Sequence, residues 1–133
     1  MSSQISRRAG NLNGTLINAA FVTTQQVSAD QANVNGRGVI VVLDVTVINV
    51  GGMGNGSVTL SIQGRDSASG KYYALLSGAP VSSVSTNVYT IYPDVPPVPN
   101  VAAQTPLPAT WRVIIKANNA NPVSYTVGAS VIQ

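Results

Sequence analysis

The side chains that most often perform catalysis or bind metals are scarce in this chain. It contains no His, no Cys and no Glu, and its only carboxylate side chains are Asp30, Asp44, Asp66 and Asp94. This inventory excludes a thiolate nucleophile, a Ser-His-Asp triad, a zinc finger and an iron–sulfur cluster, because each of these sites depends on a missing side chain. A hydrolase with paired carboxylates would have to be assembled from four scattered aspartates. We therefore expect a protein that is not an enzyme and that has no cofactor and no metal site.

The charge pattern also argues against several partners. The net charge of +3 rests on seven cations, of which only Arg7 and Arg8 are adjacent. No aromatic side chain is interleaved with this pair to stack on bases, so we expect no direct contact with nucleic acid. No segment approaches the roughly 18 apolar residues that span a membrane, and the amino terminus matches an export signal poorly. We expect a soluble, unprocessed chain without a membrane partner.

Hydrophobic periodicity predicts strands and almost no helix. Residues 57–66 alternate apolar and polar side chains, which is typical of a half-buried strand. Residues 39–50 are apolar on both faces except at three positions, which predicts a central strand that is covered on both sides. A glycine-rich turn joins the two segments, and this order predicts a long β-hairpin over residues 39–66. The further predicted strands are 15–22, 71–77, 87–92, 110–117 and 123–132.

These strands set the expected architecture. About seven strands in 133 residues, with no strand and helix alternation, predict an all-β, single-domain β-sandwich or jelly roll. We assign residues 1–14 to an extended N-terminal arm and residues 15–133 to the sandwich. The sandwich includes a proline-rich loop over residues 92–108, which we expect to be stiff and without hydrogen bonds of its own.

Six aromatic side chains admit two interpretations. They either form a platform for sugar rings or pack in the core with their polar tips satisfied. Core packing is favoured for Trp111, for Tyr125 and for one of Tyr72 and Tyr73, because these residues are in phase with apolar neighbours on predicted strands. The other members of the set are Tyr89 and Tyr92.

The order of segments from Val39 onward resembles a known group of proteins. A hydrophobic strand leads to a strand that ends in Gly64-Arg65-Asp66, then to an aromatic strand at Tyr72-Tyr73, and later to the strand LPATWR over residues 107–112. Over residues 39–132 this pattern is similar to small β-sandwich virion proteins of tailed bacteriophages, and head decoration (capsid cement) proteins are the nearest family. The amino-terminal arm lies outside the resemblance.

The resemblance implies a structural role without catalytic residues. Decoration proteins sit on the assembled head, bridge neighbouring major capsid protein subunits and often form trimers. We therefore expect a virion protein of the capsid surface, made in the host cytoplasm, with the major capsid protein and further copies of itself as partners. Two alternatives stay open: another virion component of the neck, tail or fibre, and a glycan-binding or adhesion module. The expected partner-binding residues lie in the arm and the loop, and they are Arg7, Arg8, Tyr92, Pro96, Pro97 and Pro99.

Overall fold

The computed structural model describes residues 12–48, 50–51 and 54–133, and every regular element in these ranges is a β-strand. The longer strands are β1 (Leu12–Val22), β4 (Gly38–Ile48), β7 (Val58–Arg65), β8 (Tyr72–Ser77), β9 (Ser85–Ile91), β11 (Thr110–Ala117) and β12 (Val123–Ile132). The two-residue strands are β2 (Gln26–Val27), β3 (Gln31–Ala32), β5 (Val50–Gly51), β6 (Gly54–Asn55) and β10 (Ala102–Ala103). Each of the predicted strands is therefore present. The described residues include no helix with the length and apolar character needed to span a membrane.

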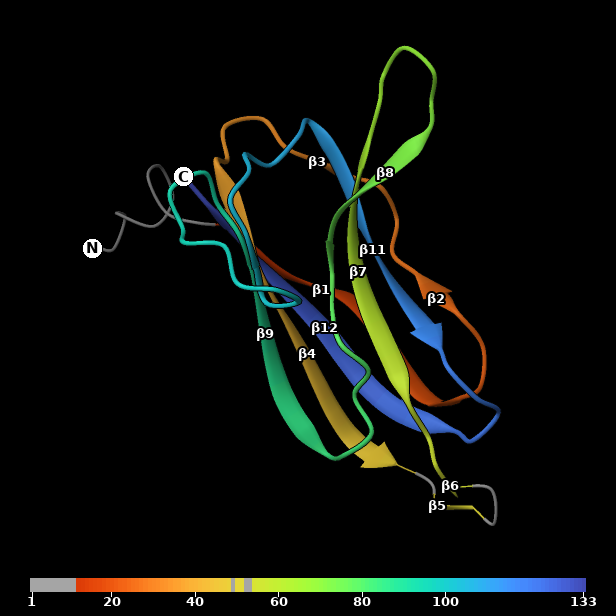
Figure 1. Cartoon of the computed structure of the whole chain (residues 1–133). Coiled ribbons are helices and arrows are strands. Elements are labelled where there is room, and N and C mark those ends of the chain that lie inside the picture. Colours follow the sequence, from red (N-terminus) through yellow and green to blue (C-terminus); the bar gives the residue numbers. More distant parts are fainter. Residues whose placement is uncertain (1–11, 49, 52–53) are drawn as a thin grey trace, which may run out of the picture.

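The strands form two sheets that face each other, and the β5–β6 pair lies apart at one end (Figure 1). Sheet A has the order β1-β12-β4-β9-β10, and sheet B has the order β2-β11-β7-β8 with β3 also paired to β11. We count β2 and β3 as one interrupted strand and set β5, β6 and β10 aside. The sheets then run β1-β12-β4-β9 and β2/β3-β11-β7-β8, which is the connectivity of a jelly roll. The all-β sandwich or jelly-roll prediction is confirmed.

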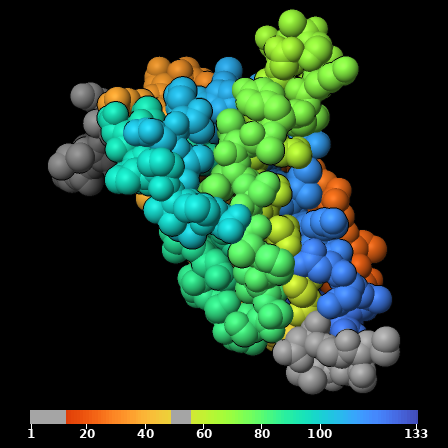
Figure 2. Space-filling model, in the orientation of Figure 1, coloured from red at the N-terminus to blue at the C-terminus, as the bar shows by residue number. Residues whose placement is uncertain are grey.

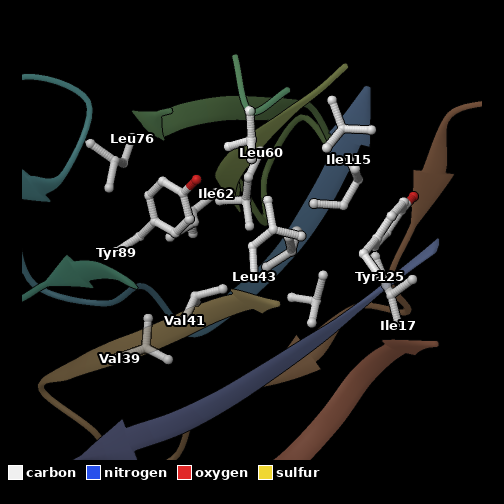
Figure 3. Packing of buried hydrophobic residues seen from close by; sticks show 14 of the residues in the cluster. Ile17, Val39, Val41, Leu43, Leu60, Ile62, Leu76, Tyr89, Ile115 and Tyr125 are labelled. Atoms are coloured by element: carbon white, nitrogen blue, oxygen red, sulfur yellow. The ribbon is translucent and has the colours of Figure 1, made fainter. Parts of the chain in front are cut away.

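The core fills the space between the two sheets. Every second side chain of a strand points to the same face, and in β4 the inward side chains Val39, Val41, Leu43 and Val45 are at most 1% exposed. Figure 3 shows how residues of β4 meet Leu60 and other side chains from sheet B. Burying one such side chain contributes about 1.5–3 kcal/mol. The alternation of apolar and polar side chains along each strand therefore determines which face of the strand turns inward.

The predicted hairpin over residues 39–66 is wrong. β4 pairs with β12 and β9 in sheet A, whereas β7 pairs with β11 and β8 in sheet B. The chain crosses from one sheet to the other between these strands, and among the described residues of the connection β5 pairs with β6. β4 and β7 therefore lie in opposite sheets, and their inward side chains, such as Leu43 and Leu60, belong to one core between the sheets.

Two further boundaries differ from the prediction. β1 begins at Leu12, so residues 12–14 belong to a strand rather than to the arm. The proline-rich loop does form hydrogen bonds of its own: the Ala102 N–H donates to the Val98 carbonyl at 2.9 Å, and the Thr90 N–H of β9 donates to the Val101 carbonyl at 2.9 Å. The prolines leave enough N–H donors between them for turns and for the short parallel strand β10.

The strand edges are irregular. β2 and β3 both pair with β11, but Ser28, Ala29 and Asp30 interrupt the line between them. β1, at the edge of sheet A, has irregular register between Thr15 and Ile17 and again between Ala19 and Val22. At the opposite edge, β10 covers only Thr90 and Ile91 of β9.

Candidate interaction surface

The outward face of sheet A is uncharged at its centre. Ile40 and Val42 of β4 lie between β12 and β9, and Val42 is paired with Gly128 on one side and with Val88 on the other. Val88 is 49% exposed. Residues that share this orientation in the register form what we call the sheet A face: Asn13, Thr15, Asn18, Ile40, Val42, Asp44, Thr86, Val88, Thr90, Thr126, Gly128, Ser130 and Ile132.

No Lys or Arg belongs to this face within the described ranges. Its one carboxylate is Asp44, which accepts a hydrogen bond from the Thr86 hydroxyl at 3.1 Å. The apolar pattern of residues 39–50 predicts that the segment containing β4 is covered on both sides. Among the described residues only the inner side is covered, and the outer side chains Ile40 and Val42 remain partly exposed. An apolar centre ringed by hydroxyl and amide groups, with charge depleted, is typical of the middle of a protein–protein interface.

Two shallow hollows adjoin on this face. The first, of about 400 Å³, lies over Gly128 and is lined by Ile40, Val42 and the start of β1. The second, of about 320 Å³, is lined by Thr90, Tyr92, Asp94, Val95 and Ile132. Their linings are neighbours in the sheet, because Ile40 of the first pairs with Thr90 of the second. The second hollow combines residues of the sheet A face with residues of the proline-rich loop.

Tyr92 forms the rim of the second hollow. Its ring lies under the guanidinium of Arg37, with the Arg37 Cζ 5.4 Å from the ring centre, and Arg37 forms a 3.6 Å ion pair with Asp94. Both charged side chains are exposed, so the ion pair contributes little to stability. The contact instead holds the tyrosine ring at the junction between the sheet and the loop.

The structure places the predicted partner-binding residues in two groups. Tyr92 is partly buried at the rim, whereas Pro96, Pro97 and Pro99 are exposed on the same loop. Figure 2 shows this loop, in green-blue, gathered on one flank of the molecule. Arg7 and Arg8 lie outside the described residues.

The aromatic residues do not form a common platform. Trp111, Tyr125 and Tyr89 are buried in the core, which confirms core packing for the first two. The expectation that their polar tips are satisfied is wrong, because Trp111 Nε1 and the Tyr125 hydroxyl have no hydrogen-bond partner among the described residues. The prediction that one of Tyr72 and Tyr73 packs in the core is wrong, because Tyr72 lies on the outward face of sheet B and Tyr73 on the same strand is 45% exposed. Since Trp111 is 2% exposed, its ring faces core side chains and not solvent.

A second group of polar side chains lies on the outward face of sheet B. The Cζ atom of Arg112 is 3.4 Å from the centre of the Tyr72 ring, and its Nε donates to Gln63 Oε1 at 2.9 Å. The Tyr72 hydroxyl donates to the carboxylate of Asp30, with distances of 2.8 and 2.9 Å to its two oxygens. Arg65 pairs with the same carboxylate at 3.4 Å.

Sequence reasoning missed this cluster and one exposed aromatic side chain. The cluster joins residues from three strands and a loop, so no local sequence pattern predicts it. Phe21 is 58% exposed and has a φ of 47°, a left-handed conformation that is strained for a bulky residue. Its backbone N–H donates to Ser124 Oγ at 2.8 Å. The bulge at the end of β1 therefore holds an aromatic ring in solvent.

The carboxylates are too far dispersed to form a metal site. Asp30 and Asp94 each face an arginine, Asp44 faces a threonine, and Asp66 lies in the β7–β8 turn. The Ser69 hydroxyl and the backbone N–H groups of Ala68 and Ser69 donate to Asp66, and these hydrogen bonds lower the pKa of its carboxyl. No group of three potential metal-binding side chains occurs in the part of the chain that the structure describes.

Comparison of the chain with protein-family models, with curated protein sequences and with solved structures yields no match.

Proposed function

We propose that this chain is a structural virion protein without catalytic activity, which binds the capsid shell of a bacteriophage and bridges major capsid protein subunits. The observation that carries the proposal is the uncovered apolar centre of the sheet A face. Ile40 and Val42 belong to the most hydrophobic strand of the chain, yet no described residue covers their outward side. A partner protein that packs on this face would complete the burial that the sequence of β4 predicts.

The adjoining loop supports the same proposal. Tyr92, Pro96, Pro97 and Pro99 extend the contact area beyond the sheet, and a loop already ordered by turns loses little entropy when it binds. The proposed partners are the major capsid protein and further copies of this chain on the capsid surface. Many such contacts on a symmetric lattice add through multivalency, so each contact needs only modest affinity.

Binding to capsids that lack this protein tests the proposal. Purified wild-type protein and the variants Val42→Arg and Val88→Arg are mixed with such capsids from the source virus, and the bound copies are counted after sedimentation. We expect both variants to lose binding, because a buried arginine without a partner is costly. Thr59→Arg, on the outward face of sheet B, is the matched control and should bind as the wild type does. If Val42→Arg and Val88→Arg, with unchanged melting temperatures, bind as well as the wild type, the sheet A face is not the contact.

Copy number distinguishes this proposal from the alternative virion positions. A lattice component is expected at a ratio to the major capsid protein that is fixed by the symmetry of the shell. A handful of copies per particle would instead place the protein at the neck, the tail or a fibre, and absence from virions would favour an adhesion module.

A further inference from the structure

The outward face of sheet B differs from the sheet A face in charge. Arg112 and Lys116 point outward from β11, on the same side as Gln63 and Arg65 of β7. In the described part of the chain Asp30 is ion-paired with Arg65, whereas Arg112 and Lys116 have no ion pair. The local charge on β11 is therefore positive and uncompensated.

The guanidinium of Arg112 is held in one orientation. Tyr72 covers one face of it at 3.4 Å, and Gln63 accepts the hydrogen bond from Nε. Tyr72 is itself fixed by its hydrogen bonds to Asp30. The two terminal nitrogens, Nη1 and Nη2, have no partner among the described residues. A guanidinium whose position is already fixed presents a planar pair of N–H donors, which matches the two oxygens of a carboxylate.

The side chains along β11 set the distance between the two cations. Arg112, Ile114 and Lys116 alternate along the outward face of β11, so the two cations are separated by about 13 Å at 3.3 Å per residue. Ile114 lies between them, and its cross-strand neighbour Val27 is 45% exposed. The surface therefore presents a cation, an apolar site and a second cation in a line.

We propose that this line of Arg112, Ile114 and Lys116 is a docking site for an acidic segment of a protein partner in extended conformation. The segment would place two carboxylate side chains four residues apart over the cations and an apolar side chain midway over Ile114. A nucleic acid fits less well, because Asp30 lies within the cluster, and because only two uncompensated cations face a backbone that carries a charge at every nucleotide. The inference is independent of the capsid proposal, since it concerns the opposite face of the sandwich and is tested on the isolated protein.

A titration followed by NMR tests the inference. The probe is the peptide Ser-Glu-Ser-Val-Ser-Glu-Ser, added to the ¹⁵N-labelled full chain at low salt. We expect concentration-dependent shifts of the Arg112 Nε–H signal and of the Ile114 and Lys116 amides, and a loss of these shifts when both glutamates of the probe are replaced by glutamine. Arg112→Gln should weaken binding about fivefold or more, because a charge-assisted hydrogen bond is lost. Arg112→Lys, which keeps the charge without the planar fork, should give an intermediate affinity.

The control is Arg37→Gln, which removes an exposed cation that lies on the other side of the sandwich and should leave the affinity unchanged. Three results would overturn the inference: equal affinity of the wild type and Arg112→Gln, an equal loss in Arg37→Gln, or shifts that map to other parts of the surface. A single-stranded oligonucleotide that binds more tightly than the peptide at the same signals would also overturn it, in favour of a nucleic-acid site.

Discussion

Ser28 and Val113 are joined by two hydrogen bonds. In one of them the serine hydroxyl takes the place of the backbone carbonyl that a regular sheet would supply. The Ser28 N–H donates to the Val113 carbonyl at 2.9 Å, and the Val113 N–H donates to the Ser28 hydroxyl oxygen at 2.9 Å. This pair lies between the two short pairings of β11 with β2 and with β3. The serine thereby satisfies a buried N–H of a central strand at the point where the neighbouring strand is interrupted.

Ser28→Ala should destabilise the fold. The substitution leaves the buried Val113 N–H without an acceptor, which costs about 1–3 kcal/mol. Urea unfolding measures the change. Ser61→Ala, on the outward face of the same sheet, is the matched control and should change the free energy of unfolding by less than about 0.5 kcal/mol. Equal effects of the two substitutions would show that the hydroxyl of Ser28 does not stabilise the interrupted edge.

Tyr125 should make stability depend on alkaline pH. Burial raises the pKa of Tyr125 to about 12, whereas a tyrosine in an unfolded chain titrates near pH 10. Between these values the unfolded chain loses a proton that the folded chain keeps, so the free energy of unfolding falls as pH rises. The stability that protonated Tyr125 contributes is fully present below about pH 10. Above that pH, its loss lowers the free energy of unfolding by at most about 1.4 kcal/mol per pH unit.

Tyr125→Phe isolates this contribution. The buried Tyr125 hydroxyl has no partner among the described residues, so the variant should be as stable as the wild type or more stable at pH 7. Its stability should fall less between pH 9 and 11.5, although some loss remains because burial also raises the pKa of Tyr89. Urea unfolding at both pH values gives the comparison. Parallel curves for the two proteins would refute the role of Tyr125.

Gly38→Ala should disturb the junction between the sheet A face and the proline-rich loop. A Cβ atom at this position would collide with the Ile91 carbonyl oxygen and lie 2.7 Å from Cδ1 of Tyr92. We expect a loss of about 1–3 kcal/mol, as for other overpacked sites, together with a change in the near-ultraviolet signal of tyrosine. Gly14→Ala is the control, because a Cβ there has no atom within 4 Å. A Gly38→Ala protein with wild-type melting and spectrum would contradict this expectation.

Tyr92→Ala tests the loop separately from the sheet. The proposed function predicts weaker binding to capsids, by about tenfold if the ring behaves as an anchor of roughly 1.4 kcal/mol. The measurement is the protein concentration at half-saturation of sedimented capsids. Tyr73→Ala, an exposed tyrosine on β8, serves as the control. Unchanged capsid binding by Tyr92→Ala would remove the loop from the proposed contact.

Deletion of residues 1–11 tests the arm. The arm predicted from the sequence ends at residue 14, but residues 12–14 pair with β12, so a deletion that includes them would also damage sheet A. We expect the shorter deletion to abolish capsid binding or self-association while the melting temperature stays nearly constant. If the shortened protein still binds capsids and still self-associates, Arg7 and Arg8 are not anchors.

Strand positions were predictable, whereas pairings between strands far apart in the chain were not. The alternation in residues 57–66 depends only on neighbours along the chain, and it correctly predicted β7. β7 pairs with its hairpin neighbour β8 on one side and with β11, about 50 residues away, on the other. Nothing local distinguishes the pairing with β11 from a hairpin with β4. The glycine-rich segment suggested the hairpin, but the chain crosses there from sheet A to sheet B.

The two candidate surfaces also differ in how much of each could be predicted from the sequence. The apolar outward positions of β4 are visible in the sequence, because residues 39–50 are hydrophobic on both faces. The Arg112 cluster is not visible, because Gln63 and Asp30 come from positions 49 and 82 residues earlier in the chain. Tyr92 was identified from its place beside the prolines, and the structure adds its contact with Arg37.

The interrupted edges have a consequence for behaviour at high concentration. A long, straight edge strand offers its backbone groups to the edge of another molecule, and this pairing is a route to fibrous aggregates. Here β2 and β3 are two residues each, and β1 has two irregularities in its register. These two edges therefore pair poorly with the sheet of another molecule, which favours contacts between molecules through faces and loops over extension of the sheets at β1 and at β2/β3.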